Sequence, residues 1–105
     1  MTENDPYFID FPGRIWAIQQ EMARDGVDVY LGSRLRTLSW TTDAFCPWRS
    51  HIVIPLDGLP TVFTFVIDAA RVADESWLDF DHVLGFAPMG GQDQIEAVSD
   101  KIKSH

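Results

Sequence analysis

The segment Ile-Val-Ile-Pro-Leu-Asp-Gly-Leu-Pro-Thr-Val-Phe-Thr-Phe-Val-Ile, residues 52–67, decides the fold of this 105-residue chain. Two runs rich in β-branched and aromatic residues, Ile52 to Leu56 and Thr61 to Ile67, lie on either side of four turn-forming residues. This pattern predicts a β-hairpin. The second run is apolar on both faces, which is typical of a strand in the middle of a sheet that is covered on two sides.

A helix and a strand are predicted upstream of the hairpin. Apolar residues recur at helical spacing between Arg14 and Met22, so this segment is predicted to be a helix. Gly26 then provides the left-handed residue that commonly ends a helix. Apolar and polar residues alternate from Val27 to Leu31, which indicates a strand.

The segments on either side of these elements are less regular. Residues 1–12 mix proline, acids and aromatics, and we expect an N-terminal arm that precedes a domain over residues 13–105. Ser33 is expected to cap a short helix through Trp40. Thr41 to Trp48 should be a loop, because a proline and a Thr-Thr-Asp cluster interrupt any periodicity.

The second half of the chain is predicted to add helices and a further strand. Asp68 is expected to cap a helix that ends near Asp74, and His82 to Phe86 is expected to be a short strand. Asp93 and Glu96 resemble a capping box for a final helix. The predicted fold class is therefore α/β, a single three-layer domain with a mixed sheet and helices on both faces.

The charge of the chain bears on its partners. A net charge of −8 argues against nucleic acid, because phosphate binding depends on clustered Lys and Arg. Five of the eight basic residues are arginines before residue 50, whereas residues 50–100 contain nine acids and one arginine. Two readings remain open, a locally positive patch and scattered arginines in solvent.

Cysteine content and hydropathy bear on location. Cys46 is the single cysteine and cannot form an internal disulfide, and the N-terminus lacks the features of a signal peptide. No stretch approaches the ~20 apolar residues of a membrane span. We expect a cytoplasmic protein without a membrane partner.

The sequence offers no convincing metal site. His51, His82 and His105 lie far apart, without the helical spacing of a zinc site. Asp79 and Asp81 would share one face if they lay in a strand, and the interpretation favoured here is a solvated strand entrance. No metal ligand and no catalytic residue is therefore predicted in this chain.

Two other patterns contain groups that could act as a nucleophile or bind an anion. Cys46 and His51 contain the groups of a thiol nucleophile and its base, but nothing in the sequence orients them, so an inert, partly buried thiol is expected. Gly90 and Gly91 precede a helix, where backbone amides can bind an anion. The acid Asp93 is expected to occupy that helix N-terminus instead.

The loop before the hairpin contains the candidate binding residues, Trp48 and Arg49. Tryptophan and arginine are enriched in binding hot spots, and arginine offers paired donors to a carboxylate. The alternative is that Trp48 closes the core beneath the loop while Arg49 pairs with a nearby acid.

The order of these elements resembles the N-terminal domain of the creatinase, prolidase and aminopeptidase P superfamily. The resemblance rests on Gly26-Val27-Asp28 after the first helix and on Gly58-Leu59-Pro60 in the hairpin. The segment from Leu35 to Thr41 departs from the usual turn of that superfamily, with Trp40 near the expected glycine.

The resemblance implies a ribonuclease H-like domain without catalytic residues. Divalent metal, where present in that superfamily, is bound by the C-terminal catalytic domain, which lies outside this chain. Trp48 and Arg49 resemble an aromatic and arginine pair that reaches across the dimer and holds the substrate carboxylate in the partner subunit.

The expected function follows from that resemblance. The chain is expected to be the N-terminal domain of a creatinase or Xaa-Pro dipeptidase-like hydrolase, a homodimer with a C-terminal catalytic domain in the same polypeptide. The isolated chain is expected to be inactive. The alternative is a free-standing binding or interaction module of the same fold.

Overall fold

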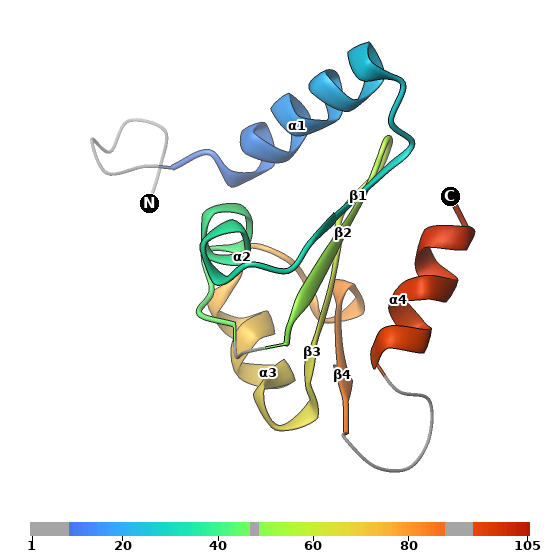
Figure 1. Cartoon of the computed structure of the whole chain (residues 1–105). Helices are drawn as coiled ribbons and strands as arrows, with labels where there is room; N and C mark the ends of the chain where they lie inside the picture. Colours follow the sequence, from blue (N-terminus) through green and yellow to red (C-terminus); the bar gives the residue numbers. More distant parts are fainter. Residues whose placement is uncertain (1–8, 47–48, 88–93) are drawn as a thin grey trace.

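The computed structural model describes residues 9–46, 49–87 and 94–105. Figure 1 shows the elements in chain order. They are α1 (Phe11–Asp25), β1 (Val29–Gly32), α2 (Leu35–Thr42), β2 (His51–Pro55), β3 (Thr61–Phe65), α3 (Val66–Glu75), the 3-10 helix η1 (Phe80–His82), β4 (Val83–Phe86) and α4 (Gln94–Lys103).

The strands form one mixed sheet in the order β1-β2-β3-β4. The predicted hairpin is confirmed, since β2 and β3 pair antiparallel with His51 opposite Phe63. β1 pairs antiparallel with β2, and β4 pairs parallel with β3. A parallel pair needs a crossover connection, which α3 supplies.

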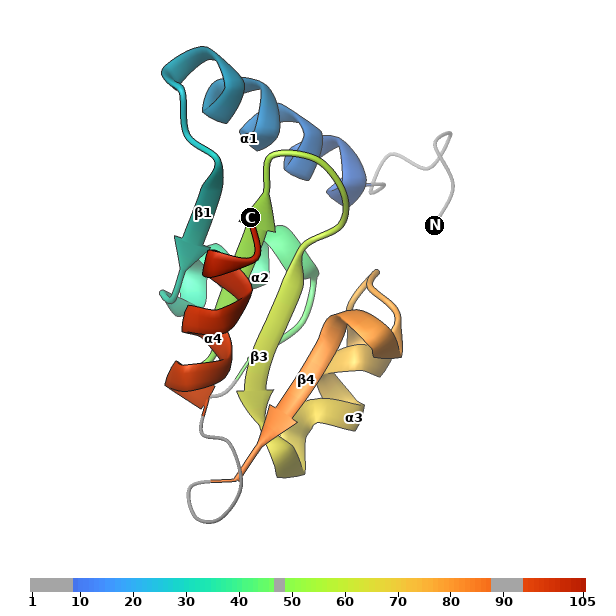
Figure 2. The same cartoon turned by 90° about the vertical axis from the view of Figure 1, so that its right-hand side faces the viewer.

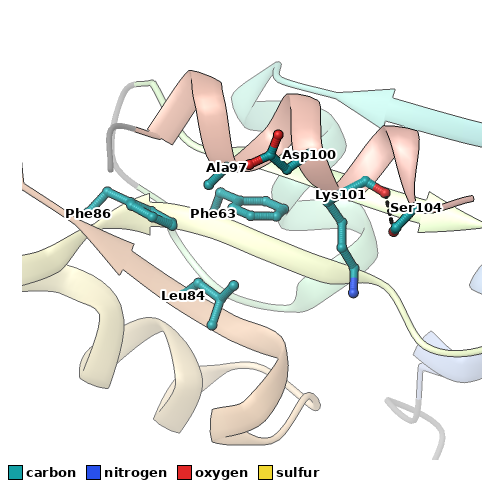
Figure 3. Close-up of a pocket in the computed structure, with 7 residues that line it drawn as sticks. All are labelled: Phe63, Leu84, Phe86, Ala97, Asp100, Lys101 and Ser104. Atoms are coloured by element: carbon teal, nitrogen blue, oxygen red, sulfur yellow. Dashed lines mark hydrogen bonds between the residues drawn. The ribbon is translucent and has the colours of Figure 1, made fainter. Parts of the chain in front are cut away.

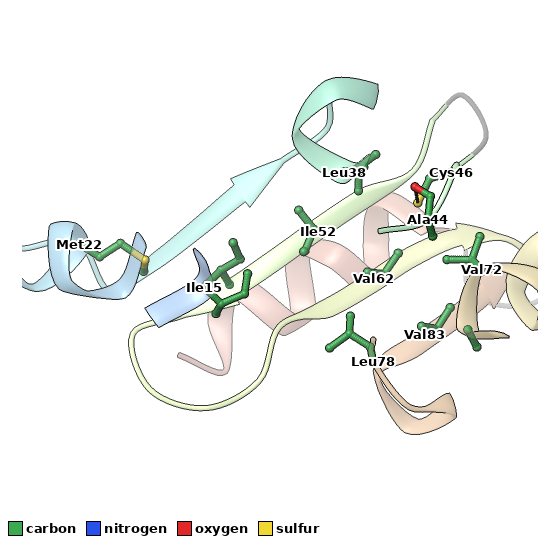
Figure 4. Packing of buried hydrophobic residues seen from close by; sticks show 12 residues of the cluster. Ile15, Met22, Leu38, Ala44, Cys46, Ile52, Val62, Val72, Leu78 and Val83 are labelled. Carbon is green, nitrogen blue, oxygen red and sulfur yellow. Dashed lines mark hydrogen bonds between the residues drawn. The ribbon is translucent and has the colours of Figure 1, made fainter. Parts of the chain in front are cut away.

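Helices cover both faces of this sheet, as the sequence predicted. In Figure 1 the sheet is seen nearly edge-on, with α2 and α3 on one side and α4 on the other. Figure 2 shows α4 in front of the strands. The larger core cluster joins α1, α2 and α3 to the sheet through Ile52, Ile54 and Val62 (Figure 4). The smaller cluster joins Val53 and Phe63 to α4.

Helix α1 begins inside the segment expected to be an arm. The side chain of Asp10 caps it by accepting a hydrogen bond from the Gly13 amide at 2.9 Å, and Pro12 lies in the first turn, where its missing N–H costs nothing. Phe11 is buried on the first turn. Gly26 ends the helix at φ 73°, as predicted.

Helix α2 is longer than predicted and begins without the expected cap. Its N-cap residue is Arg34, which makes no side-chain capping bond, so the prediction for Ser33 was wrong. Thr41 and Thr42 belong to the helix and are fully buried, not part of a loop. Their hydroxyl groups donate to the carbonyls of Thr37 and Leu38, which lets polar side chains lie in the core.

The apolar run of the second hairpin strand divides between two elements. β3 ends at Phe65, and Val66 and Ile67 form the first turn of α3, where they are 50% and 79% exposed. Phe65 is the N-cap, so Asp68 lies in the first turn and does not cap the helix. Its negative charge in the first turn still stabilises the helix through the helix dipole, and its carboxylate pairs with Arg71 at 3.1 Å.

The segment before β4 is an exposed 3-10 turn that leads directly into the strand. Residues 80–82 form η1, so Asp79 and Asp81 do not share a strand face. The His82 ring donates from Nδ1 to the Asp79 carboxylate at 2.6 Å. This hydrogen bond holds the pKa of the Asp79 carboxyl below its usual range.

None of the helices in the described ranges has the length and apolar character needed to cross a membrane.

Candidate functional site

Arg49, one of the two predicted binding residues, lies two residues before β2 and is exposed. Its backbone has φ 69°, in the left-handed region that residues with a Cβ seldom adopt. Trp48, the other predicted residue, lies outside the described residues. The structure therefore places the arginine of the pair and its backbone.

The chain on the C-terminal side of Arg49 is fixed to the sheet. Ser50 is fully buried, and its Oγ lies 2.9 Å from the Thr64 Oγ1 on β3. The next residue, His51, begins β2 and shares a hydrogen bond between its Nδ1 and the Gln94 Oε1 of α4. Arg49 is therefore attached to a rigid strand, which favours precise positioning of its side chain.

The chain on the N-terminal side of the loop is fixed as well. Ala44 and Cys46 are buried in the larger core cluster (Figure 4). Between them, the Phe45 amide donates to the Glu75 Oε1 at 3.2 Å, and Arg71 donates from Nη1 to the Phe45 carbonyl at 2.8 Å. The loop is thus tied down before residue 47 and after residue 49.

Cys46 and His51 do not form a nucleophile and base. Cys46 is 1% exposed in the cluster on the α1, α2 and α3 side, whereas His51 contacts Gln94 of α4 on the opposite side of the sheet. Burial raises the pKa of the Cys46 thiol. A neutral buried thiol is a poor nucleophile, which agrees with the inert role expected from the sequence.

A groove of about 390 Å³ lies between α4 and β4 (Figure 3). Phe63, Leu84, Phe86 and Ala97 supply its apolar lining. Polar residues at positions 100 and 101 of α4, and at position 104 just after the helix, line it as well. The ring of Phe63 stacks near that of Phe86, with centroids 6.0 Å apart. Within the described residues β4 has β3 as its neighbour on one side and no strand on the other.

Within the described residues, no three His, Cys, Asp or Glu side chains converge in a way that could hold a metal ion. Two features of the described residues are suited to binding: Arg49, whose backbone is anchored at one end of the sheet, and the apolar groove beside β4.

Solved structures of the same fold include dipeptidase domains. The chain superposes with a TM-score of 0.68 on the creatinase/prolidase N-terminal domain of an X-Pro dipeptidase from Streptococcus pyogenes, with 18% identity over 88% of this chain and 66% of that one. The chain has the creatinase/prolidase N-terminal domain fold. A corresponding domain of a putative metallopeptidase from Corynebacterium diphtheriae gives a TM-score of 0.64, with 16% identity over 86% of this chain and 67% of that one.

Sequence comparison gives one curated relative at lower coverage. An ectoine hydrolase from Halomonas elongata is 27% identical over 78 residues, which make up 70% of this chain. The chain spans 19% of that protein's length, and no family model matches the sequence.

The sequence predictions for Arg49, for the glycine pair before α4 and for the α4 groove had three different outcomes. Arg49 lies before the predicted hairpin, which is present, and its role as a binding residue stays a prediction. The helix N-terminus considered as an anion site, with Gly90, Gly91 and Asp93, lies outside the described residues. Sequence reasoning missed the α4 groove, although alternate apolar residues Leu84 and Phe86 on a strand were the signal for an apolar sheet face.

Proposed function

We propose that this chain is the N-terminal domain of a creatinase or Xaa-Pro dipeptidase-like hydrolase. In this proposal it has no catalytic role, contributes to dimer contacts, and supplies Trp48 and Arg49 to the substrate pocket of the partner subunit. The parent enzyme is cytoplasmic, and any divalent metal binds in its C-terminal catalytic domain.

The observation that supports the proposal most is the conformation of Arg49. Left-handed backbone at a residue with a Cβ costs about 1–2 kcal/mol, and such costs tend to persist at functional sites. Here the cost falls on an exposed arginine between two anchored segments, in a domain with the creatinase/prolidase N-terminal fold. An exposed guanidinium on an anchored backbone suits a planar carboxylate, which it can bind with two parallel hydrogen bonds.

The names of the matched proteins suggest the substrates to test. Xaa-Pro dipeptides and ectoine are the substrates named for the two kinds of relative, and creatine is the one suggested by the superfamily. All three contain a carboxylate, the group that Arg49 is proposed to hold.

The first experiment measures hydrolysis by the isolated chain and by the natural protein. The chain should hydrolyse none of the three substrates with added manganese or cobalt, whereas the natural protein should hydrolyse at least one. Turnover by the isolated chain that survives repurification and disappears on substitution of His51 or His82 would contradict the proposal.

The second candidate function is a free-standing binding module, and the groove between α4 and β4 is the observation that favours it. A natural protein with an intact mass near 11.9 kDa, the mass of this chain, would support this candidate. A larger mass with a continuous reading frame would support the hydrolase domain.

A further inference from the structure

Apart from Arg49, the arginines of this chain fall into two groups. Arg24 and Arg71 form ion pairs with acids of their own helices. Within the described residues, Arg14, Arg34 and Arg36 have no carboxylate within ion-pair distance. Charges without a counterion are notable in a protein with a net charge of −8.

The three arginines of the second group lie on neighbouring parts of α1 and α2. The Arg14 guanidinium stacks 4.4 Å from the centre of the Trp40 ring and donates from Nη1 to the Trp40 carbonyl at 2.8 Å. Arg36 precedes Trp40 by four residues, so the two share one face of α2. Arg34 is the N-cap residue of the same helix. Arg34 precedes Arg36 by two residues and therefore points away from that face. We call Arg14, Arg36 and Trp40 the basic-aromatic face.

Trp40 remains 46% exposed although Arg14 covers part of it. An aromatic ring that is already beside one guanidinium, with a further arginine on the same helix face, is suited to an acidic and aromatic partner.

The same chain presents a surface with the complementary character. Phe80 is 68% exposed at the start of η1, and Asp79 and Asp81 lie on either side of it in the sequence. The Asp79 carboxylate binds His82, whereas the Asp81 side chain has no hydrogen bond or ion pair in the described residues. We call Asp79, Phe80 and Asp81 the acidic turn.

We propose that the basic-aromatic face binds the acidic turn of a second copy of this chain. Phe80 packs against the exposed part of Trp40, and the Asp81 carboxylate approaches Arg36. In a two-fold dimer each copy provides one face and one turn, so the contact forms twice. This inference gives a surface to the dimer contacts of the proposed function, but it is tested on this chain alone.

Charge favours a second copy over a nucleic acid as the occupant. A net charge of −8 repels both occupants, but a long polyanion would also cross the acidic remainder of the chain, whereas the acidic turn brings its negative charge to the arginines alone. A second copy instead brings an acidic turn and a basic face together in both directions.

The experiment uses sedimentation velocity of the chain at about 100 μM, above the micromolar Kd of many weak contacts. The unmodified chain should dimerise, and added salt should weaken the dimer. Arg36→Glu alone and Asp81→Arg alone should each raise the dimerisation Kd about tenfold or more, because each variant places two like charges together in both contacts. Both side chains are exposed, so folding should be retained, which circular dichroism checks.

The decisive sample is an equimolar mixture of Arg36→Glu and Asp81→Arg. In the mixed dimer one contact is native and the other pairs Glu at position 36 with Arg at position 81, so dimerisation should return to within about threefold of the unmodified chain. Arg24→Glu and Asp57→Arg make the same charge changes at exposed positions elsewhere and should leave the Kd unchanged.

Three results would overturn the inference. They are a monomeric unmodified chain, single variants that dimerise like the unmodified chain, and a mixture that stays as weak as its components. A dimer that ignores both substitutions would show contact through another surface, and the proposed role of Arg49 would still stand or fall on its own test. The unmodified chain could also stay monomeric and bind an added polyanion, with that binding lost in Arg36→Glu. This result would refute the second copy as the occupant.

Discussion

The left-handed backbone of Arg49 predicts an unusual order of stability between two substitutions. Arg49→Ala and Arg49→Gly both remove the guanidinium, so any contact that the side chain makes is lost equally. They differ at the backbone, where alanine retains the strain of φ 69° and glycine does not.

The size of the difference follows from two opposing terms. Left-handed backbone costs a residue with a Cβ about 1–2 kcal/mol, which Arg49→Gly removes. Glycine loses about 0.5–1 kcal/mol more conformational entropy on folding than alanine. Arg49→Gly should therefore be more stable than Arg49→Ala by about 0.5–1 kcal/mol, which corresponds to about 4 °C in Tm for a domain of this size.

Urea denaturation and thermal melting of the two variants measure this difference directly. Gln20 provides the matched control, because it is exposed in the middle of α1, where glycine should be less stable than alanine by about 1 kcal/mol. If Arg49→Ala exceeds Arg49→Gly in stability by about 0.5–1 kcal/mol, the difference expected from the entropy of glycine alone, the backbone at this position is not strained. The argument that links its conformation to function would then fail.

Two further predictions concern the core. Gly85→Ala should destabilise the chain by about 1–3 kcal/mol in urea denaturation, because a Cβ there would lie 2.9 Å from both the Ala69 Cβ and the Val66 Cα. Unchanged stability would mean that α3 does not pack closely on β4. Cys46 should react with a thiol reagent at pH 8 far more slowly in the folded chain than in urea, because burial raises its pKa and blocks access; equal rates would contradict its burial.

The hairpin and the helix ends marked by glycine could be predicted because their signals are local. Gly26 and Gly58 both have positive φ in the structure, at the helix end and the turn where the sequence placed them. The layer arrangement followed from the apolar character of β3 on both faces, which requires a cover on each side.

The division of the apolar run after Phe65 could not be predicted from its composition. Val66 and Ile67 continue the β-branched pattern, and short apolar runs do not distinguish a strand from a helix. The distinction depends on tertiary packing, since Gly85 leaves room for the backbone of Val66 to approach β4. The buried threonines of α2 were mistaken for a loop for a related reason, because their hydroxyl groups are satisfied within the helix.

The place of Arg49 before the hairpin could be predicted, but its backbone conformation could not, and its role as a binding residue stays a prediction. The hairpin and the superfamily resemblance indicated Arg49, whereas a left-handed residue other than glycine has no reliable sequence signal. The stacking of Arg14 on Trp40 joins residues 26 positions apart, so it depended on how α1 packs against α2.

The most direct test of the proposed function is the kcat/KM of the natural enzyme with Arg49→Ala and Arg49→Lys. If Arg49 holds a substrate carboxylate in the partner subunit, both variants should lose about 30- to 1000-fold, or about 2–4 kcal/mol of transition-state binding. Lysine should be nearly as poor as alanine because it cannot form the two parallel hydrogen bonds, and stability should change little. If Arg49→Ala instead lowers the Tm by several degrees and leaves kcat/KM of the folded enzyme intact, Arg49 is a structural residue and the proposed role is wrong.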